Sequence, residues 1–217
     1  MKRDAACRIF RALVQTYPEA VEEDPACEDP FQVLVATVLS AQTTDRQVAS
    51  ISRDLFSRYP DARSLAAAEV EDLERIIRPT GYYHVKARHL IAAARALLDR
   101  FGGEVPLAME DLLALPGVGR KTANIVLSAC GKDEGIAVDT HVFRIARRIG
   151  LSHGKSPDRV EQDLLALYPR RAWGKVNGLF ITHGRECCTA RNPRCGECPV
   201  RLYCRYFRDT PQGTQQI

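Results

Sequence analysis

Four cysteines near the C-terminal end constrain this chain more than any other feature of its sequence. Their spacing is C-x6-C-x2-C-x5-C, and it brings four thiols into seventeen residues: Cys188, Cys195, Cys198 and Cys204. A structural zinc site usually takes paired ligands from two separate segments, whereas one short winding segment can surround an iron-sulfur cluster through four cysteines. The spacing therefore predicts an iron-sulfur cluster, with a zinc site and disulfides as the alternatives.

A fifth cysteine, Cys187, directly precedes the first of the four. Adjacent cysteines rarely bind one cluster together, so we expect Cys188 to be the ligand and Cys187 to be a structural neighbour, with the reverse as the alternative. The loop between the first two ligands carries Arg191 and Arg194. A basic loop of this kind can contact DNA phosphates, and a solvated turn is the alternative.

The composition fits an intracellular protein with a polyanionic partner but does not demonstrate one. The formal net charge is +4 over 217 residues, a mild basic excess. The first ten residues, MKRDAACRIF, lack the apolar core of a signal peptide, and no apolar run approaches the roughly 18 residues of a membrane span. We therefore expect a cytoplasmic or nucleoid-associated protein with no membrane segment. A reducing compartment disfavours disulfides, which strengthens the prediction of a cluster.

Helical periodicity dominates the rest of the chain. Apolar residues share one helix face in residues 9 to 14, 48 to 55 and 90 to 97, and no alternating strand pattern occurs. Residues that suit a helix N-cap are Asp29, Asp139 and Ser156. Proline or glycine marks the expected helix ends: Tyr17-Pro18, Tyr59-Pro60, Arg78-Pro79, Gly102-Gly103, Gly131 and Tyr168-Pro169. The pattern predicts an all-α fold of roughly ten helices.

A glycine-containing hairpin joins two of these helices. Residues 115 to 124 are LPGVGRKTAN. Gly117 and Gly119 permit tight turns that a side chain would block. They also expose amides at a helix N-terminus, where free N–H groups and partial positive charge bind a phosphate without reading a base. A plain helical turn with no ligand explains this string equally well when it is taken alone.

Three more motifs, one before the hairpin and two after it, occur in an order that resembles one enzyme family. They are LSAQTTD at 39 to 45, VDTHVFR at 138 to 144, and HGR at 183 to 185 before the four cysteines. With the hairpin, they make the chain similar to endonuclease III, a helix-hairpin-helix DNA glycosylase, from about residue 31 to residue 204.

This resemblance implies a fold of two helical domains with the active-site cleft between them. The first would be a six-helix barrel at residues 22–133, and the second a cluster domain built from residues 1–21 and 134–217. The resemblance also implies a [4Fe-4S] cluster with a structural or redox-sensing role rather than a hydrolytic one.

The resemblance further implies removal of oxidised pyrimidines from duplex DNA, followed by AP lyase cleavage through a Schiff base. Carried over by motif position, Lys121 would be the nucleophile and Asp139 the catalytic carboxylate, which can stabilise positive charge on the sugar. Desolvation and a helix N-terminus would favour the neutral amine of Lys121. Without the family context, Lys121 is a solvent-facing residue and Asp139 is only an N-cap.

The DNA contacts that we expect on the same basis come from several motifs. Gln42 would fill the gap that a flipped nucleotide leaves, and an ordinary exposed glutamine at a helix end is the alternative. Asp45 would lie near the lesion pocket, or more simply cap the next helix. Tyr82 stands where the family commonly has a leucine wedge, and its alternative is packing on its own domain. Further contacts are expected from the hairpin and from the VDTHVFR motif: Gly117, Val118, Gly119, His141 and Arg144. For His141 a place in the core is the alternative.

The expected partner is double-stranded DNA with damaged bases or abasic sites, bound by a monomer. A monofunctional adenine glycosylase is the nearest rival, but such enzymes lack a lysine at the position of Lys121. A DNA-binding protein without enzymatic activity would need neither Asp139 nor a cluster. A zinc-knuckle module is too small to account for a chain of this size.

Overall fold

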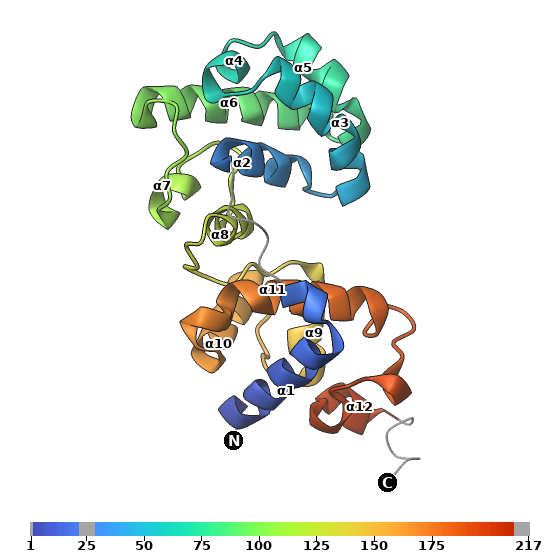
Figure 1. Ribbon diagram of the computed structural model, residues 1–217. Helices are drawn as coiled ribbons and strands as arrows, with labels where there is room; N and C mark the ends of the chain where they lie inside the picture. The colour runs from blue at the N-terminus through green and yellow to red at the C-terminus, as the bar shows by residue number, and fades with distance from the viewer. Residues whose placement is uncertain (1, 22–28, 211–217) are drawn as a thin grey trace. The chain divides into compact units, whose positions relative to one another are not determined.

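A computed structural model describes residues 2–21 and 29–210, and within them every regular element is a helix. This confirms the all-α prediction. The chain divides into two compact units, one of residues Asp24–Lys132 and one of residues Met1–Glu23 with Asp133–Ile217 (Figure 1). The bound that we predicted at residue 22 falls among residues 22–28, outside the described residues.

The continuous unit, Asp24–Lys132, is built around its longest helix. Its helices are α2 (Pro30–Leu39), α3 (Asp45–Arg58), α4 (Ala62–Ala66), α5 (Val70–Ile77), α6 (Tyr83–Phe101), α7 (Met109–Leu113) and α8 (Arg120–Ala129), with a 3-10 turn at Arg78–Thr80. Helix α6 packs against α4, α5 and α2, while α8 packs against α2 and α7. Leu90 and Leu97 on α6 are buried in this core, as their helical spacing predicted.

The second unit surrounds helix α9. Its helices are α1 (Lys2–Thr16), α9 (Thr140–Ile149), α10 (Pro157–Leu167), α11 (Trp173–Glu186) and α12 (Arg205–Asp209), with 3-10 turns at Pro18–Val21, Arg170–Ala172, Cys195–Glu197 and Arg201–Tyr203. Helix α9 packs against α10, α11 and α12, and α1 packs against α10 and α11. Ile145 on α9 and Phe180 on α11 are fully buried in this core.

Local sequence signals account for many of the helix bounds. The side chains of Asp29, Asp139 and Ser156 each accept a hydrogen bond from a backbone amide in the first turn of the following helix, so the three predicted N-caps are confirmed. Helices α3 and α10 end one residue before Tyr59 and Tyr168, each of which precedes a proline. The chain needs no tertiary contact to form these bounds, because each signal lies within a few residues of the helix end.

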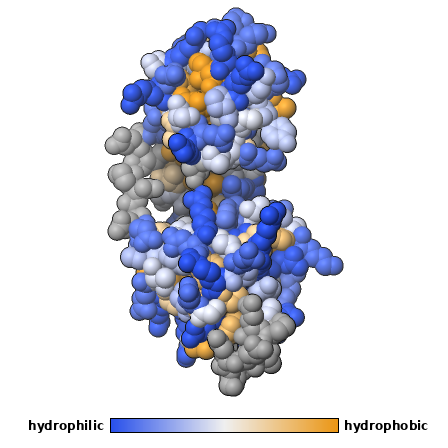
Figure 2. All heavy atoms as spheres, turned by 90° about the vertical axis from the view of Figure 1, so that its right-hand side faces the viewer, coloured by the Kyte–Doolittle hydropathy of each residue, from blue (hydrophilic) through white to orange (hydrophobic). Residues whose placement is uncertain are grey.

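Hydrophilic side chains cover most of the face drawn in Figure 2, and apolar ones occupy smaller areas. The large apolar side chains that are exposed lie on several separate elements: Tyr82, Val85, Leu107, Leu113, Leu202 and Tyr206. Within the described residues, no helix combines the length and the apolar character that crossing a bilayer would require.

Candidate active site and cluster site

At Gly117 of the hairpin, both the backbone conformation and the neighbouring residues require a glycine, whereas at Gly119 they do not. Gly117 has a φ of 78°, and a Cβ there would lie 2.8 Å from the Cβ of His89. Gly119 has a φ of −97° and open space around the position of a Cβ. We predicted that a side chain at either glycine would block the turn. For Gly119 this prediction is wrong. Its lack of a side chain instead leaves room for a ligand close to the backbone.

The amides of this hairpin suit an anion. Gly119 is the N-cap of the ten-residue helix α8 and has no side chain with which to cap it. The amide of Val118 donates to the carbonyl of Leu115 at 3.2 Å, while among the described residues the amides of Gly117 and Gly119 have no partner. The Val118 side chain is buried in the core. The turn is therefore anchored by Val118 and presents two glycine amides beside a helix N-terminus.

Lys121 is the second residue of α8, and its side chain is exposed. The expected position at a helix N-terminus is thus present, but the protein does not desolvate the amine by burying it. An exposed primary amine one turn from two free amides can approach a sugar whose phosphate lies on the hairpin. We expected the Lys121 amine to be desolvated, and its exposed side chain does not fit this expectation.

Asp139 is the N-cap of α9, and its carboxylate accepts a hydrogen bond from the amide of Val142 at 2.8 Å. The side chain is half-buried. Buried residues 136 to 138 lead into this cap, so the chain before the carboxylate is held in the core. The carboxylate therefore has a fixed direction, which is what electrostatic stabilisation of a developing charge requires.

His141 lies in the first turn of α9 and is half-buried, so its alternative place in the core is wrong. Burial lowers the pKa of His141, Asp139 opposes this shift, and the charge of Arg144 adds to it. Nη2 of Arg144 lies 3.1 Å from Nδ1 of His141. Because a guanidinium only donates, Nδ1 must accept, and the proton of the neutral ring is then on Nε2.

Arg144 also joins α9 to the segment that carries the first cysteine ligand. Its Nε donates to the carbonyl of Cys188 and its Nη2 to the carbonyl of Gly184, both at 3.1 Å. A Cβ on Gly184 would lie 2.6 Å from Nδ1 of His141. The glycine of the HGR motif is therefore needed for the close approach of α11 to α9. Arg144 is occupied by these contacts, and its expected role in DNA binding stays a prediction.

The four cysteines expected to bind the cluster face one cavity. Cys187 and His183 also line this cavity. Burial raises the pKa of Cys195 and Cys204, and it raises the pKa of Cys198 to about 12. A thiol must lose its proton to bind iron, so iron binding must offset this effect of burial. Four thiols around one cavity are the ligand set that a cubane cluster takes.

The geometry of the thiols also argues against a single zinc ion at the four-cysteine site. Zinc–sulfur bonds of about 2.3 Å would bring tetrahedral thiols to roughly 4 Å from one another. Among the described residues, the group whose ligand atoms all lie within 4.8 Å of one another is His183, Cys187 and Cys198. No three of the four expected ligands meet that limit, so the four together fit a larger group better than one ion.

Arg148 holds the loop after the first cluster ligand, and the sequence did not single it out. Its Nη1 donates to the carbonyl of Thr189 and its Nη2 to the carbonyl of Ala190, both at 2.7 Å. Nη1 also lies 3.5 Å from Sγ of Cys188. Its guanidinium covers the ring of Tyr206 at 4.9 Å. Arg148 thus places its guanidinium beside the first expected ligand as well as on the loop that follows it.

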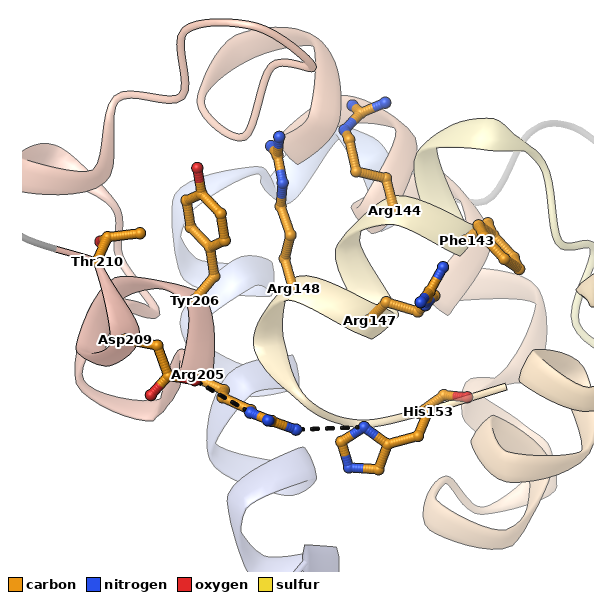
Figure 3. A pocket seen from close by; sticks show the side chains of 10 residues that line it. Phe143, Arg144, Arg147, Arg148, His153, Arg205, Tyr206, Asp209 and Thr210 are labelled. Carbon is orange, nitrogen blue, oxygen red and sulfur yellow. Dashed lines mark hydrogen bonds and ion pairs between the residues drawn. The ribbon is translucent and has the colours of Figure 1, made fainter. Parts of the chain in front are cut away.

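Arg148 also lines a basic pocket of about 650 Å³ between α9 and α12 (Figure 3). Arg144 and Arg147 come from the same helix, and Arg205 comes from α12. Arg205 bonds to Asp209 at 3.1 Å and lies 3.4 Å from His153, so part of its charge is neutralised. The pocket includes neither Lys121 nor Asp139, and we do not assign the reaction to it.

A second contact that the sequence did not reveal links the end of α1 to the cysteines. The hydroxyl of Tyr17 lies 3.1 Å from Nδ1 of His183, and Nε2 of His183 lies 3.7 Å from Sγ of Cys198. Burial lowers the pKa of His183 to about 4, so the ring is neutral at pH 7. A neutral ring can accept from Tyr17 and donate to the sulfur, which connects residues at opposite ends of the chain.

The two arginines of the cluster loop differ in their surroundings. Arg191 is exposed. Arg194 is also exposed, but its guanidinium donates to the carbonyl of Glu186 and lies 4.0 Å from the carboxylate of Glu197. Arg191 is therefore the better placed of the two to contact a phosphate.

The residues expected to enter the duplex lie on strained turns of the continuous unit. Gln42 and Tyr82 have φ values of 54° and 48°, and among the described residues they are the non-glycine positions with positive φ. The Tyr82 side chain is 69% exposed, so its packed alternative is wrong. The alternative for Asp45 is also wrong, because Thr44 is the N-cap of α3 and forms a capping box with Gln47.

Family models match most of the chain. The model of the HhH-GPD superfamily of base excision DNA repair proteins matches residues 35–170. The model of the iron-sulfur binding domain of endonuclease III matches residues 188–204, which begin and end at the first and last expected cluster ligands.

Relatives extend this match to nearly the full length. Endonuclease III of Synechocystis sp. is 44% identical, with 94% of this chain and 93% of the relative covered. Endonuclease III of Thermotoga maritima is 41% identical, with 94% of each covered. The chain belongs to the endonuclease III family. A solved structure of a trapped endonuclease III–DNA covalent intermediate is 37% identical and superimposes with a TM-score of 0.87, covering 95% of this chain and 96% of that one.

Membership of the endonuclease III family makes this chain an enzyme of base excision DNA repair, a DNA glycosylase with AP lyase activity that acts on DNA. It carries a [4Fe-4S] cluster near its C-terminal end. The prediction from the four-cysteine spacing is therefore confirmed. Zinc and disulfides, its alternatives, are not supported.

Proposed function

We propose that this endonuclease III family member removes oxidised pyrimidines from duplex DNA and cleaves the resulting abasic strand through a Schiff base on Lys121. The observation that carries the proposal is the place of Lys121, which is exposed on the second residue of α8, next to the two partnerless glycine amides of the hairpin. A phosphate on those amides would hold the neighbouring sugar within reach of the amine.

In the proposed reaction, the neutral amine of Lys121 attacks C1′ of the damaged nucleotide, and the bond between C1′ and the base breaks. The base leaves with the bonding electrons and takes up a proton. Asp139 stabilises the positive charge that develops on the sugar. The sugar ring opens and an imine forms between C1′ and Nζ. Loss of a proton from C2′ then expels the 3′ phosphate, and hydrolysis of the imine releases Lys121.

The cluster ligands that we propose are Cys188, Cys195, Cys198 and Cys204, with Cys187 as a neighbour. When bound, the cluster would fix the fold of the segment that contains Arg191, which we propose as a phosphate contact. Arg144 and Arg148 would hold the backbone of this segment on α9 through the hydrogen bonds described above.

The proposed partner is duplex DNA with a damaged base or an abasic site. Gln42 and Tyr82 would enter the duplex beside the flipped nucleotide, Asp45 and His141 would lie near it, and the hairpin would hold the backbone. The protein is proposed to act on this DNA as a monomer. Since chromosomal DNA is the proposed substrate, the nucleoid is the proposed localisation.

Borohydride trapping tests the role of Lys121, since it reduces an imine to a stable amine. Wild-type protein should be trapped on oligonucleotides that carry an oxidised pyrimidine, and Lys121→Gln should not. Lys132→Gln, which changes another exposed lysine of the same unit, is the matched control and should be trapped like wild type. Undiminished trapping of Lys121→Gln would overturn the assignment.

Strand cleavage on a panel of single lesions tests the substrate. A glycosylase with lyase activity cleaves the strand without alkali, whereas a monofunctional glycosylase needs alkali after base release. Cleavage of oxidised pyrimidines without alkali is the expected result. Release of a mispaired adenine, with cleavage only after alkali, would instead favour the monofunctional rival.

A further inference from the structure

Lys86 is a buried lysine in the continuous unit, and no carboxylate in the described part of the chain pairs with it. Its side chain is 6% exposed. Its ammonium donates to the carbonyl of Leu39 at 2.8 Å, to Oγ1 of Thr43 at 2.7 Å and to the carbonyl of Thr80 at 2.8 Å. An ammonium has three donors, and all three are used. A buried charge is costly, so this position is unusual for a lysine without a role.

The three acceptors belong to two turns that are far apart in the sequence. Leu39 ends α2 and Thr43 lies in the turn that follows, while Thr80 ends the 3-10 turn before Tyr82. The hydroxyl of Thr43 donates in turn to the carbonyl of Thr80. Nε2 of Gln47 donates to the carbonyl of Pro79 at 3.1 Å. Lys86 is therefore the buried centre of a hydrogen-bond network that joins the two turns.

Each turn carries one residue in a left-handed conformation that is rare for its type. Gln42 has a φ of 54° in the first turn, and Tyr82 has a φ of 48° in the second. Both side chains are exposed, and neither is needed to fill the core. Strained backbone of this kind persists where the surrounding structure imposes it, and it occurs often at ligand-binding sites. The network around Lys86 supplies such a constraint from the protein interior.

We propose that Lys86 is a positioning residue that holds the Gln42 turn and the Tyr82 turn in one fixed relation, so that both side chains enter a damaged duplex together. Lys86 itself is buried and touches no DNA. Because Lys86 fixes the relative position of the two turns before DNA binds, the free energy of binding includes no cost for ordering them. This inference rests on the proposed DNA contacts of Gln42 and Tyr82.

The test is a double-mutant cycle on DNA binding with Lys86→Met, which keeps a long side chain and removes the donors. The probe is a duplex with a tetrahydrofuran abasic-site analogue, compared with the same single strand. Lys86→Met should weaken duplex binding about tenfold or more, and single-strand binding should change less than about twofold. Arg95→Met is the matched control, because Arg95 also lies on α6 and bonds to a carbonyl, that of Ala66, away from both turns.

The cycle separates positioning from a general loss of stability. In a background with Gln42→Ala and Tyr82→Ala, Lys86→Met should weaken duplex binding no further, because there is nothing left to position. An equal loss in that background, or on single strands, would overturn the inference. If the background changes themselves leave duplex binding intact, the proposed DNA contacts fail and the inference fails with them. If they weaken binding and Lys86→Met does not, only the inference on Lys86 is wrong.

A second pair of variants covers the case in which Lys86→Met does not fold. Thr43→Val removes the hydroxyl that joins Lys86 to Thr80 at nearly constant volume, and Thr43→Ser keeps that hydroxyl. Thr43→Val should weaken duplex binding several-fold, and Thr43→Ser should bind like wild type. Equal binding by the two folded variants would contradict the proposal.

Discussion

The carboxylate of Asp139 accepts a hydrogen bond from the amide of Val142 at 2.8 Å, and this contact caps helix α9. One side chain thus has a structural role and the proposed role in catalysis. The two roles are separable, because an asparagine can cap a helix as well as an aspartate but has no negative charge. The cap also explains why the carboxylate keeps one direction, since the helix amide holds it there.

Asp139→Asn should keep the stability of the protein and lose most of the rate of base release. We expect base release to slow by roughly 10² to 10³, as when a preorganised electrostatic group is removed. Asp139→Ala should show the same loss of rate and also lower the free energy of unfolding by about 1 kcal/mol. Single-turnover kinetics and denaturant unfolding measure the two effects.

Ser156→Ala is the matched control for the cap, since Ser156 caps α10 through the amide of Arg159. It should lower the stability by a similar amount without slowing base release. Wild-type base release by Asp139→Asn would mean that Asp139 is only an N-cap.

Adjacent cysteines make a second prediction possible. Cys188→Ser should lose the cluster, because one thiolate ligand is gone, whereas Cys187→Ser should keep it. Iron content and the visible absorption of the purified proteins measure the difference. The reverse pattern would identify Cys187 as the first ligand, and stoichiometric zinc without iron in wild-type protein would contradict the ligand assignment as a whole.

Arg148→Met should loosen the backbone of the cluster loop. Two hydrogen bonds to carbonyls at 2.7 Å are lost, which at about 1 kcal/mol each predicts a loss of ~2 kcal/mol in stability. Release of iron to a chelator should therefore be faster than in wild type. Arg147→Met is the control on the same helix, because Arg147 is exposed and stacks on Phe143, and its iron release should match wild type.

The helix bounds were predictable because their causes are local. Asp139 bonds to an amide three residues away, and Pro169 lies two residues after the end of α10. The hydrogen bonds that hold the candidate sites are not local. Arg148 contacts the carbonyl of Ala190, 42 residues along the chain, and Tyr17 contacts His183, 166 residues along. No periodicity or spacing in the sequence connects such pairs, since only the packed fold brings them together.

The wrong predictions have physical reasons of a different kind. Thr44 and Asp45 are both good N-caps, and the choice depends on Gln47, whose side chain completes the capping box with Thr44. At the hairpin, the steric requirement falls on Gly117 because His89 of α6 packs against it. Because His89 lies on another helix, the sequence of the hairpin alone could not show which glycine is required.

Tyr82 gives the last prediction, that its ring enters the duplex as a wedge. The ring is 69% exposed and follows Gly81 on a turn before α6. If it stacks on a neighbouring base, Tyr82→Ala should cost about 1 to 3 kcal/mol in binding a damaged duplex. Single-stranded abasic DNA needs no flipping, so its binding should barely change. Titrations on the two substrates measure both effects.

The backbone of Tyr82 supplies a control that an ordinary exposed residue would not. Because its φ of 48° is strained for a residue with a Cβ, Tyr82→Gly should be more stable to unfolding than Tyr82→Ala, by about 1 kcal/mol. Both variants lack the ring and should bind the damaged duplex equally weakly, so the two variants differ in stability but not in binding. Tyr82→Phe keeps the stacking surface and should bind like wild type. Equal losses on duplex and single strand, together with a large fall in melting temperature for Tyr82→Ala, would mean that the change acts through the fold of the turn and that another residue is the wedge.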